Sequence, residues 1–530
     1  MILIVSSLSW LRTPRATVAE AARSFQGVLT YHNDNKRTGW NPAETTLTLK
    51  NMNMSTFGKL FVVNADGLVD AQPLFAPNLT VKGVQHNVLF VESENDTAYA
   101  FDADNGVPLW QSKTLAAGEV PSDYRGCSQI RPKIGITSTP VIDLAAGPHG
   151  TIYMVAMSKD SRGDYHQRLH ALDVTTGAEQ FAGPVEIGAK YPGTGDNSHG
   201  GFVIFDPKNY KERAGLLLLD HVVYTTWASH CDAGLYTGWI IGYDQTTLAQ
   251  QTVLNLTPNG SGGAIWASGA GPAADSSGNI YVLDANGSFD TTLDAKGFPI
   301  NGNYGNSILK LSTKNRKLAV ADYFDMFNTI SESDMDEDLG SGGAMVLPNI
   351  EDSSGGVHEL VVGAGKDRHI YLADRKNLGK FNSENNNQLY QDLRSVLAGG
   401  VFSAPAFANQ KIFFGAVNDS IKAFAFDGKG KLISTPQSMT SAIFHYPGAT
   451  PSISGSTKSN MILWATEHSS PVVLHAYNAN DLSVELYNSS QAPHGRDHGG
   501  KGNKFVTPTI ANGKVYVPTQ TGVGVFGLLP

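Results

Sequence analysis

The sequence predicts an all-β protein whose four-stranded antiparallel sheets stand in a closed ring, a β-propeller. Two observations predict this fold: a short motif that recurs at intervals of about 50–70 residues, and a run of small residues before each copy. The composition agrees, because 56 glycines and only 16% charged residues suit a chain of turns and buried strands. The net charge of −9 lacks the basic excess of nucleic-acid-binding proteins, so we expect no nucleic-acid partner.

The recurring motif is a strand that ends in Asp, followed by a polar turn and an apolar or aromatic residue. Its clearest copies span residues 100–110 (Ala-Phe-Asp-Ala-Asp-Asn-Gly-Val-Pro-Leu-Trp) and 171–181 (Ala-Leu-Asp-Val-Thr-Thr-Gly-Ala-Glu-Gln-Phe). Because Asp and Gly favour tight turns, we expect the motif to lead from the third strand of each sheet to the outer one. Weaker copies contain residues 242–244, 310–312, 372–374, 425–427 and 476–478.

The runs of small residues predict the innermost strands, where the sheets converge on the axis. Several contain Pro, which a strand tolerates at its first residue. Alternating strands such as residues 88–91 and 152–155 follow them. The runs begin at Ala71, Ser138, Ser268, Gly342, Ser403, Ala449 and Val506.

The two ends of the chain predict how the ring closes. Residues 505–529 supply three strands, and the strand at residues 57–63 has no unit of its own. Pairing them gives an eight-bladed propeller with no open sheet edges; seven blades with flanking strands is the alternative. Residues 28–530 then form a single domain.

Residues 1–27 are interpreted as a leader or as a disordered tail. The apolar run Ile2–Val5 precedes the first basic residues, whereas in a secretory signal the basic residues come first. No apolar stretch reaches 18 residues, so we expect no transmembrane segment.

The motif copies resemble the repeat of the pyrroloquinoline-quinone (PQQ)-like propellers, Ala-x-Asp-x-x-Thr-Gly-x-x-x-Trp, with Asn105 in place of Thr and Phe181 in place of Trp. Residues 31–35 and 227–232 also look like those of uncharacterised secreted PQQ-like proteins. The resemblance implies the fold and, for the Trp and Asp of the repeat, roles in interblade packing and turns. The same repeat occurs in quinoprotein alcohol dehydrogenases, which are enzymes, and in the outer-membrane-assembly lipoprotein, which is a scaffold.

The two cysteines bear on compartment and cofactor. Cys127 and Cys231 are not adjacent, unlike the paired cysteines of quinoprotein alcohol dehydrogenases, and no CxxCH motif is present, so we expect no haem. In a secreted or periplasmic protein, the localisation we expect, they would form one disulfide; two buried thiols are the alternative. No dinucleotide or phosphate-binding fingerprint occurs in a supporting context, so we expect no nucleotide.

A propeller binds its ligand on the axis, at the face whose loops enter the innermost strands. Aromatic and charged residues gather in these loops, although solvated loops at the mouth of the ring are the alternative interpretation. The candidates for cofactor binding are Trp266, a stacking residue, and the cations Lys133, Lys366, Arg368, Arg496 and Lys504, which suit a carboxylate or phosphate. The catalytic candidates are Arg131, His445, Tyr446 and His498.

Three carboxylates suggest a calcium site. Asp334, Asp336 and Asp338 have alternating spacing, but the sixth and twelfth positions of that loop are Leu339 and Met345, so it is not an EF-hand. An acidic surface loop is the alternative.

Three functions remain open on this evidence. The first is an exported quinoprotein-type oxidoreductase that acts on alcohols or sugars, with PQQ and Ca²⁺ on the axis. The second is a non-catalytic propeller that binds a protein or a glycan. The third is a cofactor-independent polysaccharide lyase or hydrolase. In each case we expect a monomer.

Overall fold

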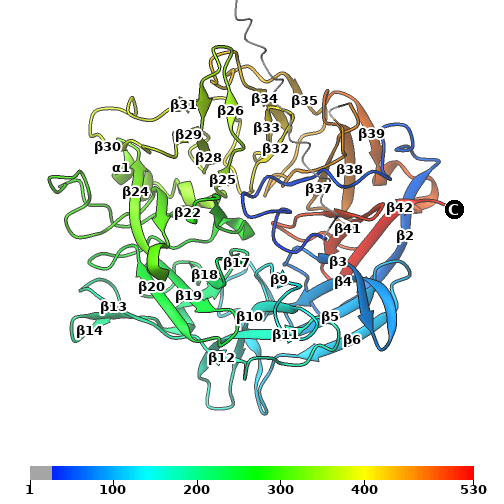
Figure 1. The fold of residues 1–530 in the computed structure, drawn as a ribbon, viewed down its shortest axis with the longest axis horizontal. Helices are drawn as coiled ribbons and strands as arrows, with labels where there is room; N and C mark the ends of the chain where they lie inside the picture. Colours follow the sequence, from blue (N-terminus) through cyan, green and yellow to red (C-terminus); the bar gives the residue numbers. More distant parts are fainter. Residues whose placement is uncertain (1–24, 26, 458) are drawn as a thin grey trace, which may run out of the picture.

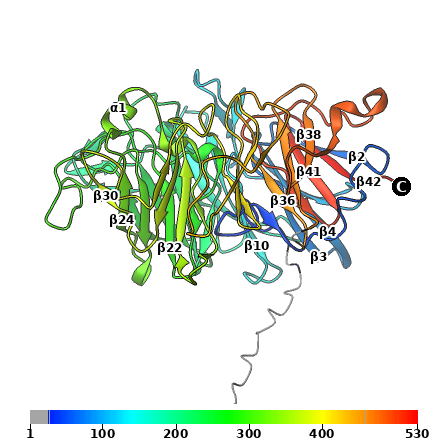
Figure 2. The same ribbon diagram turned by 90° about the horizontal axis from the view of Figure 1, so that it is seen from above.

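A computed structural model describes Phe25, residues 27–457 and residues 459–530. Nearly all of its regular structure is β; the one α-helix in this part of the chain, α1 (Thr329–Asp334), has six residues. The sheets stand side by side around a central axis (Figure 1), and the side view shows a thick disc with α1 at its upper face (Figure 2). The predicted fold class is confirmed. The expected leader lies outside the described residues, apart from Phe25 and Gly27.

Eight sheets of the described chain repeat one pattern, in which antiparallel strands run outward from the axis. From the innermost strand outward they are: β3 (Leu74–Val81), β4 (Val84–Ser93), β5 (Thr97–Asp102), β6 (Pro108–Lys113); β9 (Val141–Asp143), β10 (Thr151–Lys159), β11 (Tyr165–Asp173), β12 (Val185–Glu186); β17 (Leu217–Leu219), β18 (Val222–Ser229), β19 (Trp239–Asp244), β20 (Gln250–Asn255); β21 (Ala273–Ala274), β22 (Asn279–Leu283), β23 (Ile308–Ser312), β24 (Ala319–Asp325); β25 (Met345–Val346), β28 (Leu360–Ala364), β29 (Ile370–Asp374), β31 (Gln391–Leu393); β32 (Ala406–Ala408), β33 (Lys411–Phe414), β34 (Lys422–Ala425), β35 (Ser438–Met439); β36 (Ser452–Ser454), β37 (Ile462–Glu467), β38 (Val473–Asn478), β39 (Glu485–Asn488); and β40 (Thr509–Ala511), β41 (Lys514–Thr519), β42 (Gly522–Leu528), β2 (Phe57–Asn64).

Shorter strands and 3₁₀ turns decorate these sheets. The strands are β1 (Trp40–Asn41), β7 (Val120–Asp123), β8 (Lys133–Ile134), β13 (Lys190–Pro192), β14 (Ser198–His199), β15 (Phe202–Ile204), β16 (Tyr210–Glu212), β26 (Ile350–Glu351), β27 (Val357–His358) and β30 (Lys380–Phe381). The 3₁₀ turns are Pro207–Asn209, Ala267–Gly269, Lys314–Arg316, Leu339–Ser341, Ser489–Gln491 and Pro493–Gly495.

The ring closes between the two ends of the chain, as the sequence predicts. Strand β2 pairs antiparallel with β42, from Phe57 opposite Leu528 to Asn64 opposite Gly522. The N-terminal strand is thus the outermost strand of the C-terminal sheet, and the pairing covers a sheet edge that would otherwise be open.

The repeat motif acts as both a turn and an interblade contact. The Oδ1 atom of Asp102 accepts hydrogen bonds from the backbone N–H groups of Asp104 (2.8 Å) and Asn105 (3.3 Å). Trp110 donates from Nε1 to the carbonyl of Val174 (3.0 Å) in the next motif copy. Its indole lies against Gly177, where an added Cβ would be 2.6 Å from the ring. The roles implied by the resemblance are therefore observed in this pair of sheets.

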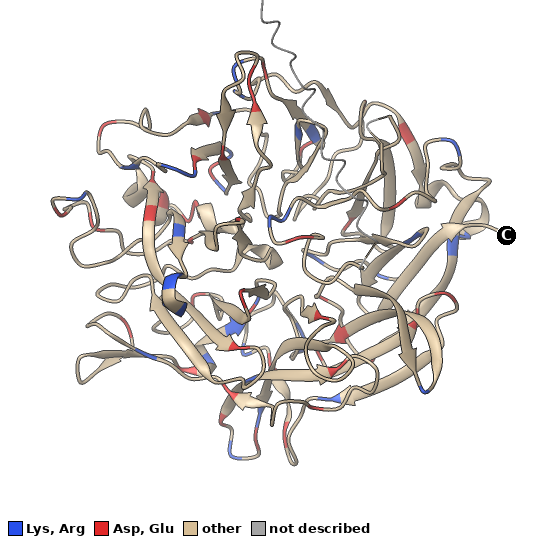
Figure 3. Ribbon diagram, viewed as in Figure 1, with Lys and Arg blue, Asp and Glu red and all other residues tan. Residues whose placement is uncertain are grey.

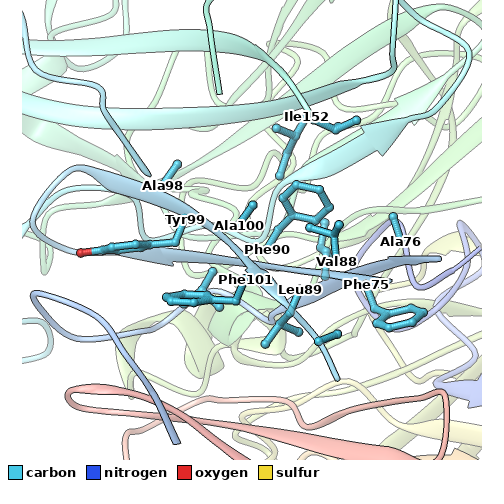
Figure 4. Close-up of a cluster of buried hydrophobic side chains, with 14 of the residues drawn as sticks. Phe75, Ala76, Val88, Leu89, Phe90, Ala98, Tyr99, Ala100, Phe101 and Ile152 are labelled. Carbon is cyan, nitrogen blue, oxygen red and sulfur yellow. The ribbon is translucent and has the colours of Figure 1, made fainter. Parts of the chain in front are cut away.

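The hydrophobic core is divided among the interfaces between neighbouring sheets. In the first cluster, the side chains of β3, β4 and β5 interlock with one another and meet Ile152 of β10 in the next sheet (Figure 4). Such contacts between successive sheets bury large side chains around the ring and leave the loops at the axis free to differ.

Residues 28–41, which we call the belt, pass the inner end of each sheet in turn; Figure 1 shows this dark blue segment at the centre of the ring. The backbone N–H of Ile142 in β9, for example, donates to the carbonyl of Leu29 (2.8 Å). Similar hydrogen bonds join Val28 to β3, Asn35 to β17 and β21, Lys36 to β25, Thr38 to β32, Gly39 to β36 and Asn41 to β40. The belt therefore connects the innermost strands of all eight sheets.

Two buried side chains hold the belt in its curved path. The guanidinium of Arg37, which is fully buried, donates to the carbonyls of Tyr31, Leu216 and Pro272 and to Oγ1 of Thr30, at 2.7–3.2 Å. The ring nitrogens of His32 lie 3.0 Å from the carbonyl of Arg37 and 2.9 Å from that of Pro451. The sequence analysis assigned this segment no structural role.

One buried carboxyl in the first sheet makes stability depend on pH. Glu92 of β4 is 1% exposed, neither of its carboxyl oxygens has a hydrogen-bond partner among the described residues, and burial raises its pKa to about 8. The unfolded chain loses this proton near its ordinary pKa of 4.5, whereas the folded chain keeps it until about pH 8. Unfolding therefore releases a proton between these values, and raising the pH favours unfolding.

We expect this group to lower the free energy of unfolding by about 1.4 kcal/mol per pH unit within that window. Glu92→Gln should remove this contribution to the dependence of the free energy of unfolding on pH. Urea unfolding at pH 5, 6, 7 and 8 would measure the change. Glu351→Gln, at an exposed position, serves as the control. An unchanged slope in Glu92→Gln would show that Glu92 ionises normally in the folded protein.

Candidate functional site

Four aromatic side chains meet where loops enter the innermost strands β21, β32, β36 and β40. Trp266 and Phe402 have ring centroids 6.0 Å apart, and Phe402 lies 5.5 Å from Tyr446. Phe505 lies 6.0–6.3 Å from all three. We call this group the aromatic floor. None of its members is fully buried, and Tyr446 is 42% exposed, so the floor offers ring faces and edges to a ligand.

The backbone beneath the floor is held in an unfavourable conformation. Ala267, Ser268 and Phe505 have φ angles of 43°, 48° and 57°. Each such residue costs about 1–3 kcal/mol and persists only where the surrounding structure enforces it. Here Ser268 Oγ donates to the carbonyl of Ser341 (2.7 Å), and Tyr31 of the belt packs beneath Ala267. The floor is therefore preorganised by the fold.

Three cations surround the floor, in a chain with few charges overall (Figure 3). The Arg213 guanidinium lies 5.5 Å and Lys504 Nζ 5.8 Å from the ring centroid of Phe505, and Lys366 Nζ lies 6.0 Å from that of Trp266. Arg213 is 5% exposed, and its Nη2 atom has no hydrogen-bond partner in the described chain. Cations beside exposed ring faces suit a flat organic anion.

A buried acid stands beside one of these cations. Lys366 Nζ lies 2.6 Å from Oδ2 of Asp338 and 2.8 Å from Oδ1 of Asp336. The N–H of Asn286 donates to Asp338 (2.8 Å). Burial raises the pKa of the Asp338 carboxyl above its ordinary value, against the opposing effect of the Lys366 ammonium. Asp338 is thus a carboxylate held in position next to the floor, where it could accept a proton from a ligand.

A second group of buried charges lies beside Arg213. Oε2 of Glu94 accepts from the N–H of Gly135 (2.6 Å) and from Oγ1 of Thr137 (3.0 Å), while Oε1 has no partner within the described residues. Burial and the nearby Asp70 raise the pKa of Glu94 well above its ordinary value. Burial lowers the pKa of Lys211 to about 8. Such shifts cluster at functional sites.

A disulfide holds the loop around Cys127 near these charges. Cys127 and Cys231 are bonded, which settles the alternative left open by the sequence. Lys211 Nζ lies 3.6 Å from Cys127 Sγ. In the same loop, Gln129 Oε1 accepts a hydrogen bond from Lys504 Nζ (2.7 Å). The loop held by the disulfide therefore contacts a cation of the site.

Some of the predicted site residues come together, and others lie elsewhere. Trp266, Tyr446, Lys366 and Lys504 meet at the floor, with Asp336 and Asp338 beside them. Arg496 donates to the carbonyl of Phe57 in β2, the outermost strand of its sheet, and the carbonyl of His498 accepts from Lys59 of the same strand. The other candidates are exposed: Lys133 in β8, Asp334 at the end of α1, and Arg131, Arg368 and His445 in loops.

The predicted metal ligands do not form a cation cage of the expected kind. Asp336 and Asp338 both pair with the Lys366 ammonium, and Asp334 is exposed at the end of α1. Across the described residues, no three His, Cys, Asp or Glu side chains gather closely enough to hold a metal ion. The donor set present therefore does not fit a bound Ca²⁺.

Sequence reasoning missed Arg213, Phe505, Glu94 and Lys211. Arg213 precedes β17, whose entry Ala214-Gly215-Leu216 lacks the Pro or Ser that marked other inner strands. His468 was also missed; it follows β37 and lines a cavity of about 10 Å³ with Phe402 and Phe505, room for about one water molecule.

Comparison with known proteins identifies solved structures of similar fold. No family model and no curated protein matches the sequence. The quinohaemoprotein alcohol dehydrogenase of Comamonas testosteroni is 14% identical, with 96% of this chain and 81% of that chain covered and a TM-score of 0.61. This chain and that enzyme share the fold of an all-β ring.

Two further solved structures give the same result. A quinohaemoprotein alcohol dehydrogenase of Pseudomonas putida HK5 is 12% identical, with 95% of this chain and 80% of that chain covered (TM-score 0.59). A europium-containing methanol dehydrogenase is also 12% identical, with 94% and 90% covered (TM-score 0.60). At such identities the likeness concerns the fold alone. No helix in the described part of the chain is long and apolar enough to cross a membrane.

Proposed function

We propose that this protein is an exported PQQ-dependent dehydrogenase that oxidises small alcohols or sugars at the aromatic floor. The observation that carries the proposal is the arrangement of three cations around the aromatic floor: Lys366 lies beside Trp266, and Arg213 and Lys504 lie beside Phe505. The Asp338 carboxylate pairs with Lys366. The solved structures with the same fold support the proposal, because they are quinohaemoprotein and methanol dehydrogenases. The disulfide supports export, since disulfides persist in oxidising compartments.

The residues of the floor fit a flat aromatic polycarboxylate such as PQQ. The indole of Trp266 provides a stacking face, and the unpartnered Nη2 of Arg213 is a buried donor that lacks an acceptor in the described chain. Arg213 and Lys504 would hold carboxylates. When bound, the quinone would supply the two-electron acceptor for oxidation of an alcohol.

The chain itself would supply the base and its positioning. Asp338, fixed by the Asn286 N–H and by Lys366, would take the hydroxyl proton of the substrate. Lys366 would stabilise the carboxylate in its ionised form, and Gln129, two residues after Cys127, would help to hold Lys504 in place.

Equilibrium dialysis against PQQ tests this function, with dye reduction by alcohols and sugars as the activity readout. We expect Trp266→Ala and Arg213→Met each to weaken PQQ binding about 10- to 100-fold, that is, by about 1.4–2.8 kcal/mol. Phe202→Ala in β15 and Arg162→Met in the turn between β10 and β11, both at exposed positions, are the matched controls. Absence of PQQ binding at about 100 µM, or equal binding by all variants, would contradict the proposal.

An acidic-glycan-binding propeller is the second candidate. Aromatic faces beside Arg213 and Lys504 also suit the ring and carboxylate of a uronic acid. Binding of oligouronates without turnover, lost in Arg213→Met, would favour it over the dehydrogenase. The lyase or hydrolase hypothesis used His498, His445, Tyr446 or Arg131. Of these, Tyr446 belongs to the floor, whereas the carbonyl of His498 accepts a hydrogen bond from Lys59 of β2.

A further inference from the structure

The Lys366 ammonium occupies the position that a bound cation would take. It lies between two carboxylates, 2.8 Å from Oδ1 of Asp336 and 2.6 Å from Oδ2 of Asp338. Asn286 joins the same group, since its Nδ2 donates to Asp336 (3.2 Å) and its N–H donates to Asp338 (2.8 Å). Its remaining amide oxygen is buried and has no hydrogen-bond partner among the described residues.

Two carboxylates and an amide oxygen belong to the ligand types that Ca²⁺ and lanthanide ions prefer. In this protein their negative charge is balanced by a side chain of the same chain. Lys366 lies in the turn after β28, and its side chain is 20% exposed. The backbone of this turn therefore positions the ammonium between the two carboxylates. The Nζ atom also lies 6.0 Å from the Trp266 ring, which places the positive charge at the edge of the aromatic floor.

The other acids near the floor do not offer an alternative cation cage. Asp70 lies 4.0 Å from the Arg213 guanidinium and also interacts with the Glu94 carboxyl. Glu94 directs Oε2 at the Gly135 N–H and the Thr137 hydroxyl. A cation entering the site would therefore have to displace Lys366 or compete with donors that the fold already provides.

We propose that the axial site works without a resident metal ion, because Lys366 supplies the positive charge that a divalent or lanthanide ion would otherwise bring. Where it concerns the quinone, this inference rests on the proposed function. The metal part can be tested on the protein alone. A site without a resident metal ion would distinguish this protein from the europium-containing methanol dehydrogenase that shares its fold.

The first test measures Tb³⁺ binding by aromatic-sensitised luminescence in the full chain. Wild type and Asp338→Asn should be indistinguishable, because the ammonium blocks the group in both. Lys366→Met should gain a site that binds Tb³⁺ at least about 10-fold more tightly than wild type does. That gain should vanish in the double variant Lys366→Met/Asp338→Asn. Lys376→Met removes an ammonium that pairs with Glu359 at 3.7 Å on the same sheet and is 65% exposed, and it should change nothing.

Two outcomes would overturn the inference in this test. One is a tight Tb³⁺ site in wild type that Asp338→Asn removes, since the metal would then bind despite Lys366. The other is the absence of any new site in a correctly folded Lys366→Met, as judged by circular dichroism, since the oxygen atoms would then not form a cation cradle.

The second test compares PQQ binding in EDTA and in 1 mM Ca²⁺. We expect wild-type affinity to agree within about 2-fold between the two buffers. Binding that requires Ca²⁺ would overturn the inference and leave the proposed function standing. Absence of binding in both buffers would overturn the proposed function, while the Tb³⁺ experiment would still decide the inference.

Discussion

Replacing both Cys127 and Cys231 with serine is expected to lower the free energy of unfolding by about 4–5 kcal/mol. The disulfide spans 104 residues, and a cross-link over so long a loop removes much of the conformational freedom of the unfolded chain. Urea unfolding of the double variant and wild type, both without reductant, measures the difference. The midpoint of the variant should lie well below that of wild type.

Reduction of the wild-type protein provides an independent control. Dithiothreitol should move its unfolding midpoint to that of the double serine variant and leave the variant unaffected. Identical midpoints for oxidised wild type and the variant would show that the bond contributes no stability. A shift in the variant on adding reductant would point to an effect unrelated to this bond.

Arg37→Leu is expected to cost about 3–5 kcal/mol of stability, because each buried carbonyl left without its donor costs about 1–3 kcal/mol. The substitution leaves the carbonyls of Tyr31, Leu216 and Pro272 without the donor that serves them in a dry environment. Burial lowers the pKa of Arg37 to about 10, which still keeps it charged at neutral pH. Equilibrium urea unfolding at pH 7 measures the loss.

Two variants sharpen this experiment. Arg37→Lys keeps the charge but offers donors from a single nitrogen, so it should recover only part of the loss. Lys36→Ala, the neighbouring position, should fall within about 0.5 kcal/mol of wild type because no hydrogen bond of its ammonium holds the described belt. A wild-type midpoint in Arg37→Leu would mean that the belt does not depend on this side chain.

The fold was predictable because its determinants are local and repeat. Asp102 and Asp173 each bind the backbone of their own turn, so the motif remains visible in the sequence wherever the turn recurs. The pairing of β2 with β42 was predictable for another reason: an incomplete unit at each end of the chain implies a shared sheet. The cysteine pairing was not, since spacing alone left both alternatives open.

The site was only partly predictable. Trp266 stands out in the sequence because it precedes an inner strand, and Lys366 because it follows a strand and a turn; the structure brings them together. The segment around His498 stood out for its charges and glycines, yet Asp497 there accepts from the N–H of Lys59 and from the hydroxyl of Tyr487, which anchors an outer turn. Local composition does not distinguish a binding loop from a structural one.

The sequence did not predict the belt, because most of its hydrogen bonds are made by backbone groups, which every residue has. Most of its contacts with the inner strands are made by backbone carbonyls such as those of Lys36 and Thr38, so no side-chain pattern marks them. Its contacts also join residues far apart in the chain: the backbone N–H of Ile453 donates to the carbonyl of Gly39. A segment that bonds by backbone over such separations leaves almost no trace in the sequence.

The belt also fixes the order in which the molecule can be completed. Residues 28–41 leave the ribosome early, yet their last partner, β40, is made hundreds of residues later, so the belt cannot complete its hydrogen bonds until then. Contacts of such long sequence separation slow folding. The closed ring and the full set of belt hydrogen bonds therefore require the last strands of the chain.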